Sequence, residues 1–470
     1  MSALTTVQRI GKFAHGAHAG HLSPQSRTLF KRNILDSLGC AIAALPGAPF
    51  AALRDQFDEY RGSGGSCSLI GGGSTSPDQA ALYNAGLVRY VDLLDSYMSP
   101  GGLCHPGDNL GAVLAAAEHA RASGADFVLA LAVAYEIQAR ITAIVPVMSK
   151  GFNHAIQLAV SASAASGKLF GLDAQQLAHA VAIATVDNVS LSCVHSEPVS
   201  QWKGFSPGMT GMRAVYAASL AKRGFTGPLR IFEGPNGLVR MFDQPVDVDW
   251  DDARLDIVQQ TVMKKYCSLI HAQPVLEATL ELKRANGIRA EDVESVVCDI
   301  FQTGFDIAGG GGFGSKDHPQ TKEQADYNLK YLIAAALLDD QVGPAQLEPE
   351  RVQAGDAQAL LAKVEVRPDA TFTAQYPAEL NARVTIRCHH GLVVSKQHMG
   401  FEGGLDNPLT WERTVQKFHW LAEPYADEKL RADIIALVVE LESHPIAALM
   451  QLLTRVSPTA CFAAQHPGIQ

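Results

Sequence analysis

Two acids and a histidine flank an early Pro-Gly-Gly turn and have the chemistry for proton transfer. Asp92 and Asp95 end an apolar helical pattern, and His105 begins the run His-Pro-Gly-Asp-Asn that opens an Ala-rich helix. Pro and Gly break helices, so these polar groups should lie on irregular backbone between two rigid segments, a position that suits catalytic side chains. On this stretch alone a structural interpretation is favoured, in which Asp108 or Asn109 caps the second helix and His105 packs beside it.

Two further polar residues precede helical patterns. His154 stands beside an Asn at the start of one helix, where a histidine is usually a capping or solvated residue. Lys203, between Trp and Gly, lies in a stretch rich in Pro and Gly ahead of a helix over 212–221. Such a lysine is usually on the surface, but a cation just before a helix is well placed to meet an anion that the helix N-terminus also favours.

Composition excludes several classes of protein. A chain of 470 residues predicts two domains, and 47% hydrophobic with 18% charged residues is typical of a folded globular protein. The net charge of −10 and the scattered basic residues argue against nucleic-acid and anionic-membrane partners. Eight widely spaced cysteines without a Cys-x-x-Cys pair argue against a zinc or iron–sulfur site and fit a reducing cytoplasm.

The first residues show no secretory signal, and the most apolar runs, such as 127–135, are too short to span a bilayer. We therefore expect a cytoplasmic protein without a membrane partner.

Helical periodicity dominates the first half of the chain, and strand patterns begin after residue 250. Short connections between the early helices predict an all-α domain, whereas the later mixture predicts an α+β domain. The chain then returns to helix. We expect a mainly α fold: a large helical domain (1–260 and 403–470) with an inserted smaller α+β domain (261–402), a geometry that favours hinge motion. The expected helices are 26–44, 79–94, 110–122, 126–144, 155–170, 174–185, 274–286, 324–338, 408–418, 427–441 and 445–453; the expected strands are 293–301, 364–366, 382–388 and 392–396.

A set of short motifs in a fixed order resembles the MmgE/PrpD family from about residue 10 to about residue 455. The motifs are His-Pro-Gly-Asp-Asn-Leu-Gly at 105–111, Lys-Leu-Phe-Gly-Leu-Asp at 168–173, Trp-Lys-Gly at 202–204, the Gly-rich run 224–234, Met-Lys-Lys-Tyr at 263–266 with His-Ala-Gln at 271–273, and Ala-Asp-Tyr-Asn-Leu-Lys-Tyr at 325–331. The resemblance implies cofactor-free enzymes, typically homodimers, that combine a helical domain with an α+β lid domain. The known activities of that family include dehydration of 2-methylcitrate and decarboxylation of cis-aconitate.

The resemblance also implies a set of site residues. The family's catalytic acid, histidines, lysines and tyrosine correspond here to Asp92, His105, His154, Lys203, Lys264 and Tyr331. Three further positions are less firmly matched: His271 is either catalytic or a neighbour, Lys265 could replace Lys264, and Ser96 could line the site.

This set suits a substrate with several carboxylates, because lysines and a protonated histidine can bind it without a metal. The same cations stabilise the charge that develops when a proton beside a carboxylate is removed, and a histidine can act as the general acid that expels a hydroxyl group. The sequence therefore predicts a metal-independent lyase, most similar to a 2-methylcitrate dehydratase. A cis-aconitate-type decarboxylase, an epimerase of a dicarboxylic acid, and a non-catalytic polycarboxylate-binding or structural dimer stay open.

Overall fold

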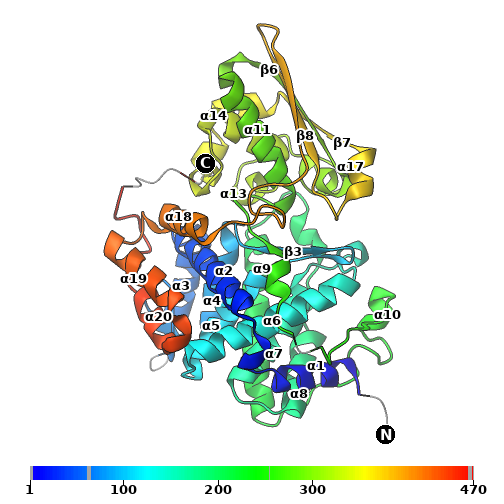
Figure 1. Cartoon of the computed structure of the whole chain (residues 1–470), viewed down its shortest axis with the longest axis vertical. Coiled ribbons are helices and arrows are strands. Elements are labelled where there is room, and N and C mark those ends of the chain that lie inside the picture. Colours follow the sequence, from blue (N-terminus) through cyan, green and yellow to red (C-terminus); the bar gives the residue numbers. More distant parts are fainter. Residues whose placement is uncertain (1–3, 61–64, 253, 464–467, 469–470) are drawn as a thin grey trace.

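The computed structural model describes residues 4–60, 65–252, 254–463 and 468 of the chain. Over these residues the fold is mainly α with three small sheets (Figure 1). The helices are α1 (Thr6–Gly16), α2 (Pro24–Ala43), α3 (Ala48–Glu59), α4 (Pro77–Tyr90), α5 (Leu110–His119), α6 (Gly124–Ile144), α7 (Ala155–Leu169), α8 (Ala174–Val186), α9 (Trp202–Lys222), α10 (Leu238–Phe242), α11 (Gln273–Asn286), α12 (Gln302–Gly304), α13 (Lys322–Ala325), α14 (Leu329–Asp339), α15 (Pro349–Val352), α16 (Gly355–Leu361), α17 (Ala370–Gln375), α18 (Trp411–Ala422), α19 (Glu428–Val439) and α20 (Ile446–Leu453).

Small residues allow the helices around α4 to pack closely. Helix α4 contacts α5 and α9, and α9 also packs against α7 and α8. A Cβ atom on Gly111 of α5 would lie 2.1 Å from the backbone nitrogen of Ala85, and one on Gly208 of α9 would lie 2.6 Å from the carbonyl oxygen of Leu82. The two glycines thus allow α5 and α9 to approach α4 so closely that the polar segment after α4 is enclosed by helices.

The strands form three separate sheets. They are β1 (Cys67–Ser68), β2 (Ser74–Thr75), β3 (Ser96–Ser99), β4 (Gly102–Cys104), β5 (Thr261–Val262), β6 (Val293–Ile300), β7 (Val364–Pro368), β8 (Ala382–Cys388) and β9 (Val393–His398). The largest sheet has the order β7-β6-β8-β9, with β6 and β7 parallel and the other pairs antiparallel. A second sheet, β4-β3-β5, pairs the Pro-Gly-Gly hairpin with the segment just before Lys264.

The four-stranded sheet and helices α11, α14 and α17 lie at one end of the molecule, and the early helices lie at the other (Figure 1). After β9 the chain returns to the early helices, where α18 and α19 contact α2, and α20 contacts α5. This return matches the expected packing of the C-terminal helices. The domain boundaries at residues 260 and 402, and a lid role for the sheet-containing part, stay predictions.

Most expected helices and strands form within a few residues of their expected ends, but three differ. Helix α4 stops at Tyr90, so Asp92 and Asp95 follow the helix instead of ending it. Helix α9 begins at Trp202 and includes Pro207, so Lys203 lies in its first turn and not ahead of it. The expected helix 324–338 is broken between α13 and α14.

Helix α6 is apolar over a greater length than the run 127–135 that the sequence analysis considered. By length and composition it could cross a membrane, yet 78% of its most apolar window is buried inside the protein. It therefore has the character of a core helix.

Candidate active site

Asp92 occupies an unusual backbone conformation directly after α4. Its φ is 51°, in the left-handed region, which Asp tolerates better than most side chains. Lys264 donates to both the Asp92 carboxylate (2.6 Å) and the Asp92 carbonyl oxygen (3.0 Å). In this conformation the carbonyl oxygen and the carboxylate of Asp92 both accept hydrogen bonds from the ammonium group of Lys264.

A chain of buried ion pairs extends from this point. The second carboxylate oxygen of Asp92 lies 3.4 Å from Lys203, whose ammonium group is 2.6 Å from Asp326, and Asp326 in turn is 2.8 Å from Lys322. We call Lys264, Asp92, Lys203, Asp326 and Lys322 the charge chain. Opposite charges alternate along it, so each carboxylate is shared by two cations, as buried charges require.

Arg89 adds a cation that the sequence analysis missed. Its guanidinium lies 3.9 Å from Asp92 and 4.0 Å from Asp108, and the side chain is fully buried. Burial alone would raise the pKa of Asp92, but Lys264, Lys203 and Arg89 together hold it well below its usual value. Asp92 is therefore a permanent anion that positions cations, and not a proton donor.

His105 is fixed by the β3–β4 hairpin that precedes it. Its Nδ1 lies 2.9 Å from the carbonyl oxygen of Asp95 and 3.0 Å from the hydroxyl oxygen of Ser96. A carbonyl oxygen only accepts hydrogen bonds, so Nδ1 carries the proton and Nε2 of the neutral ring is the basic nitrogen. Burial, with smaller effects of Arg89 and Lys264, lowers the pKa of His105 well below its usual value, so the ring is neutral and ready to accept a proton.

His154, at the start of α7, lies beside His105. The two ring centroids are 5.0 Å apart, and Nε2 of His154 is 3.4 Å from the Asp108 carboxylate. Burial lowers the pKa of His154, while Asp108 opposes that shift. Of the two rings, His154 has the carboxylate that would stabilise a proton received during a reaction.

These groups border a cavity of about 480 Å³. Its polar wall includes both rings just described together with Lys264. Two of the three N–H donors of Lys264 go to Asp92, so within the described chain one donor is left for a ligand carboxylate. Apolar side chains cover much of the remaining wall: Leu103, Pro146, Met148, Ile270, Ile307 and Phe313.

Three wall residues were not expected from the sequence. His195 and Tyr327 stack at a centroid distance of 5.3 Å, and the ammonium group of Lys203 lies 3.9 Å from the centre of the Tyr327 ring. Tyr376 is 3.4 Å from His271, an expected residue that also lines the cavity. His195 and Tyr376 fall in segments without a strong sequence pattern. Tyr327 lies inside the motif 325–331, so that motif could have identified it.

Several expected residues lie off the cavity wall. Tyr331 is buried in α14, where its hydroxyl group donates to the carbonyl oxygen of Gln346, because the break before α14 leaves Tyr327 and not Tyr331 at the cavity. Lys265 points to Glu402 (2.8 Å) and Glu277 (3.4 Å). Neither Tyr331 nor Lys265 lines the cavity in this structure, and their roles in the reaction stay predictions.

Lys203, Asp92 and Ser96 form a layer behind the wall. Neither Lys203 nor Ser96 lines the cavity. Lys203 contacts the wall residue Tyr327, and Ser96 contacts the wall residue His105. Their contacts fit residues that position the wall, instead of the direct contact with a ligand that the sequence analysis expected of Lys203 and Ser96.

Burial makes His271 a pH-sensitive element of stability. Burial, with a smaller effect of Lys264, lowers the pKa of His271 from 6.5 to about 4. Between these pH values the unfolded chain binds a proton that the folded protein does not, so the free energy of unfolding falls as pH falls from about 6.5 to 4. We expect His271→Gln to remove about 2 kcal/mol of the difference in stability between pH 7.5 and pH 4.5, measured by urea denaturation. An unchanged difference would contradict the burial of a neutral ring, and His119→Gln, at an exposed position, serves as the control.

Among the described residues, no group of three or more His, Cys, Asp or Glu side chains is arranged to hold a metal ion. The polar wall offers imidazole rings and the Lys264 ammonium group, which suit an anionic ligand, together with hydroxyl groups and one carboxylate, that of Asp306.

Sequence comparisons identify the family of the chain. Residues 8–251 match the MmgE/PrpD N-terminal domain, and residues 266–442 match the MmgE/PrpD C-terminal domain. The chain is 26% identical to 2-methylcitrate dehydratase of Escherichia coli K12 (73% of this chain, 74% of that protein). It is 25% identical to the cis-aconitate decarboxylase-like protein oryM of Aspergillus oryzae (91% and 92%), and 24% identical to the alkylcitrate dehydratase phiI of a fungal species (87% and 86%). Since the two matched regions together cover most of the sequence, the chain belongs to the MmgE/PrpD family.

Proposed function

We propose that the protein is a metal-independent lyase that removes water from a small tricarboxylate, 2-methylcitrate or a close analogue. The observation that carries the proposal is the placement of Lys264 beside His105 and His154 on one cavity wall. The names of the relatives, dehydratases and a decarboxylase-like protein, support a lyase acting on a citrate-type substrate.

The dehydration divides naturally between the two histidines. Nε2 of His105 takes the proton from the carbon beside a carboxylate, and the free donor of Lys264 stabilises the negative charge that collects on that carboxylate. His154 carries its proton in the substrate complex, where Asp108 and the carboxylates of the substrate offset the effect of burial. It gives that proton to the leaving hydroxyl group, so that water departs as the carbon–carbon double bond forms. One proton is taken up and one released at each turnover.

The apolar part of the cavity supports a substrate with an alkyl substituent. Leu103, Met148 and Ile307 offer hydrocarbon surface that citrate would leave unfilled. A methyl group buried there adds to binding, which favours 2-methylcitrate over citrate.

A decarboxylase is the second candidate, since the decarboxylase-like relative aligns over 91% of this chain. Both reactions pass through an enolate-like intermediate that the same cation stabilises. Incubation with citrate, 2-methylcitrate, cis-aconitate and iminodisuccinate in deuterated water, followed by NMR, separates them. Double-bond formation supports the dehydratase, carbon dioxide release the decarboxylase, and deuterium exchange alone an epimerase. No reaction with any of the four would contradict the proposal.

Metal independence has its own test. We expect full activity to persist after exhaustive chelation, because Lys264 and the histidines supply the positive charge that a metal would otherwise provide. Metal content is measured alongside activity. Activity that is lost on metal removal and restored by one particular ion would contradict the expectation.

A further inference from the structure

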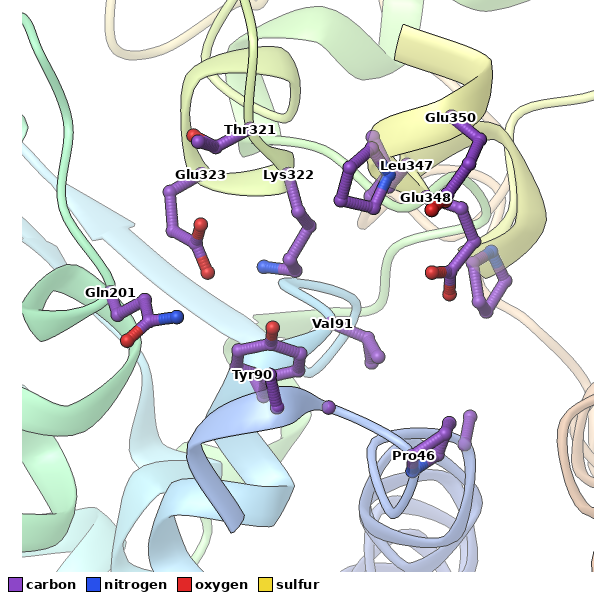
Figure 2. Close-up of a pocket in the computed structure, with 15 residues that line it drawn as sticks. Pro46, Tyr90, Val91, Gln201, Thr321, Lys322, Glu323, Leu347, Glu348 and Glu350 are labelled. Carbon is purple, nitrogen blue, oxygen red and sulfur yellow. The ribbon is translucent and has the colours of Figure 1, made fainter. Parts of the chain in front are cut away.

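A second cavity of about 330 Å³ lies at the other end of the charge chain, where Lys322 lines it as Lys264 lines the first cavity. Its wall comes from the turn after α2, the end of α4, the start of α13 and the start of α15. Figure 2 shows Tyr90 on its floor, with Lys322 and Glu323 of α13 directed toward the space above the Tyr90 ring. Within the described residues, no side chain lines both this cavity and the catalytic one.

The wall of the second cavity carries a net negative charge. Three carboxylates line it, those of Glu323, Glu348 and Glu350, and its one lysine, Lys322, is already paired with Asp326 at 2.8 Å. The carboxylates of this wall form no ion pair that the structure describes. A ligand that neutralised them would need a positive charge.

Glu323 is the residue that points to a ligand. Its side chain is only 4% exposed, and its Oε1 atom is buried without a hydrogen-bond partner in the described part of the chain. A buried carboxylate oxygen without a donor is costly, so a donor supplied from the cavity would relieve that cost. Figure 2 shows this carboxylate facing the cavity near the hydroxyl group of Tyr90.

The rest of the wall is hydrocarbon. Pro46, Val91, Pro344, Leu347 and Pro349 surround the acidic groups. Lys322 already places its ammonium group 4.3 Å from the centre of the Tyr90 ring, so a ligand cation would lie at the carboxylates and not over this ring. A ligand that fits would combine an N–H-bearing cation with an apolar body.

We propose that the second cavity binds a small organic ammonium ion, anchored by Glu323. A metal ion fits less well, because the described wall offers no cluster of three ligating side chains and much of it is apolar. An alkylammonium ion satisfies the buried oxygen, neutralises the acidic wall and covers the prolines with its hydrocarbon chain.

Glu323 is also the suitable residue to change. Lys322 belongs to the charge chain, so its replacement would disturb Asp326 and Lys203. The Glu323 carboxylate makes no described hydrogen bond or ion pair to that chain and acts on Lys322 only through its charge. Glu323→Gln keeps the size of the side chain and removes its charge. Glu294→Gln, on an exposed position of β6, removes one charge elsewhere and is the matched control.

The experiment is isothermal titration calorimetry of the full chain, without substrate, at constant ionic strength. The probes are 1,4-diaminobutane and n-butylammonium, with 1-butanol, sodium butyrate, potassium chloride and magnesium chloride for comparison. We expect one saturable site for at least one amine, with a Kd below about 1 mM. Glu323→Gln should weaken it at least tenfold and Glu294→Gln less than twofold.

Unfolding temperatures of the free variants verify that they fold. If Glu323→Gln does not fold, Ala48→Trp narrows the cavity from an exposed position and should weaken amine binding in the same way. Amine binding that is absent, or insensitive to the cavity variant that folds, would overturn the proposal. So would binding of magnesium or of 1-butanol in place of the amines. Because no substrate is present, the result is independent of the catalytic proposal.

Discussion

His105→Gln should lower kcat at least a hundredfold and leave substrate binding measurable by calorimetry. Glutamine keeps a donor that can reach the carbonyl oxygen of Asp95, as Nδ1 of His105 does at 2.9 Å, but it has no basic nitrogen for the proton beside the carboxylate. General acid–base catalysis by a positioned side chain is typically worth 10² to 10⁴ in rate. The loss should therefore appear in kcat much more than in affinity.

The control for this substitution is His119→Gln, because His119 is exposed at the end of α5, away from the cavity wall. It should keep the wild-type rate. A His105→Gln protein that turns over at more than about a tenth of the normal rate would move the proton transfer to another ring, His154 or His271.

Lys264→Ala should lower kcat/KM by roughly two to three orders of magnitude, the scale of removing one electrostatic stabiliser. Lys264 lines the cavity and is the wall residue that offers an ammonium group to a carboxylate. The fold should survive, because Asp92 keeps Lys203 at 3.4 Å and Arg89 at 3.9 Å. Steady-state kinetics on the substrate identified by NMR measure the effect, and circular dichroism verifies folding.

The neighbouring residue is a matched control. Lys265→Ala removes the same charge one position along the chain, and Glu402 keeps a second partner in Arg413 at 2.6 Å. It should therefore retain near wild-type kinetics. If Lys265→Ala loses activity and Lys264→Ala does not, the assignment of the cavity lysine is wrong.

The helices and strands that the sequence predicted correctly are those set by interactions between residues close together in the chain. Helix α8 begins where Asp173 caps it, and β8 keeps its expected ends, because capping and alternation act between near neighbours. The start of α9 was missed because Pro207 suggested a break. A proline inside a helix removes one backbone hydrogen bond and crowds the carbonyl group four residues earlier, yet this helix accommodates it. Local patterns also gave no warning that Asp92 would turn left-handed after α4.

The motifs include several residues that the structure brings to one cavity, among them His105, Lys264 and His271, whereas other wall residues are brought there only by the folding of the chain. In the sequence Arg89 is an ordinary arginine of a helix, and only the folded chain places it between Asp92 and Asp108. Tyr327 and Tyr331 are four residues apart in one motif, and only the break between α13 and α14 decides which of them reaches the cavity. Such choices depend on tertiary packing, which no short window of sequence contains.

The position of Lys264 limits how this enzyme could be recombined with its relatives. The regions that match the two family domains end at residue 251 and resume at residue 266, and Lys264 falls in the interval between them. That interval also carries β5, which pairs with the hairpin strand β3 ahead of His105. A chimaera joined at the domain limits could therefore inherit both domains intact and still separate the cavity's lysine from the hairpin and the Asp92 turn that hold it. A working chimaera would need to take residues 252–265 and the residues around Asp92 and β3 from the same parent protein.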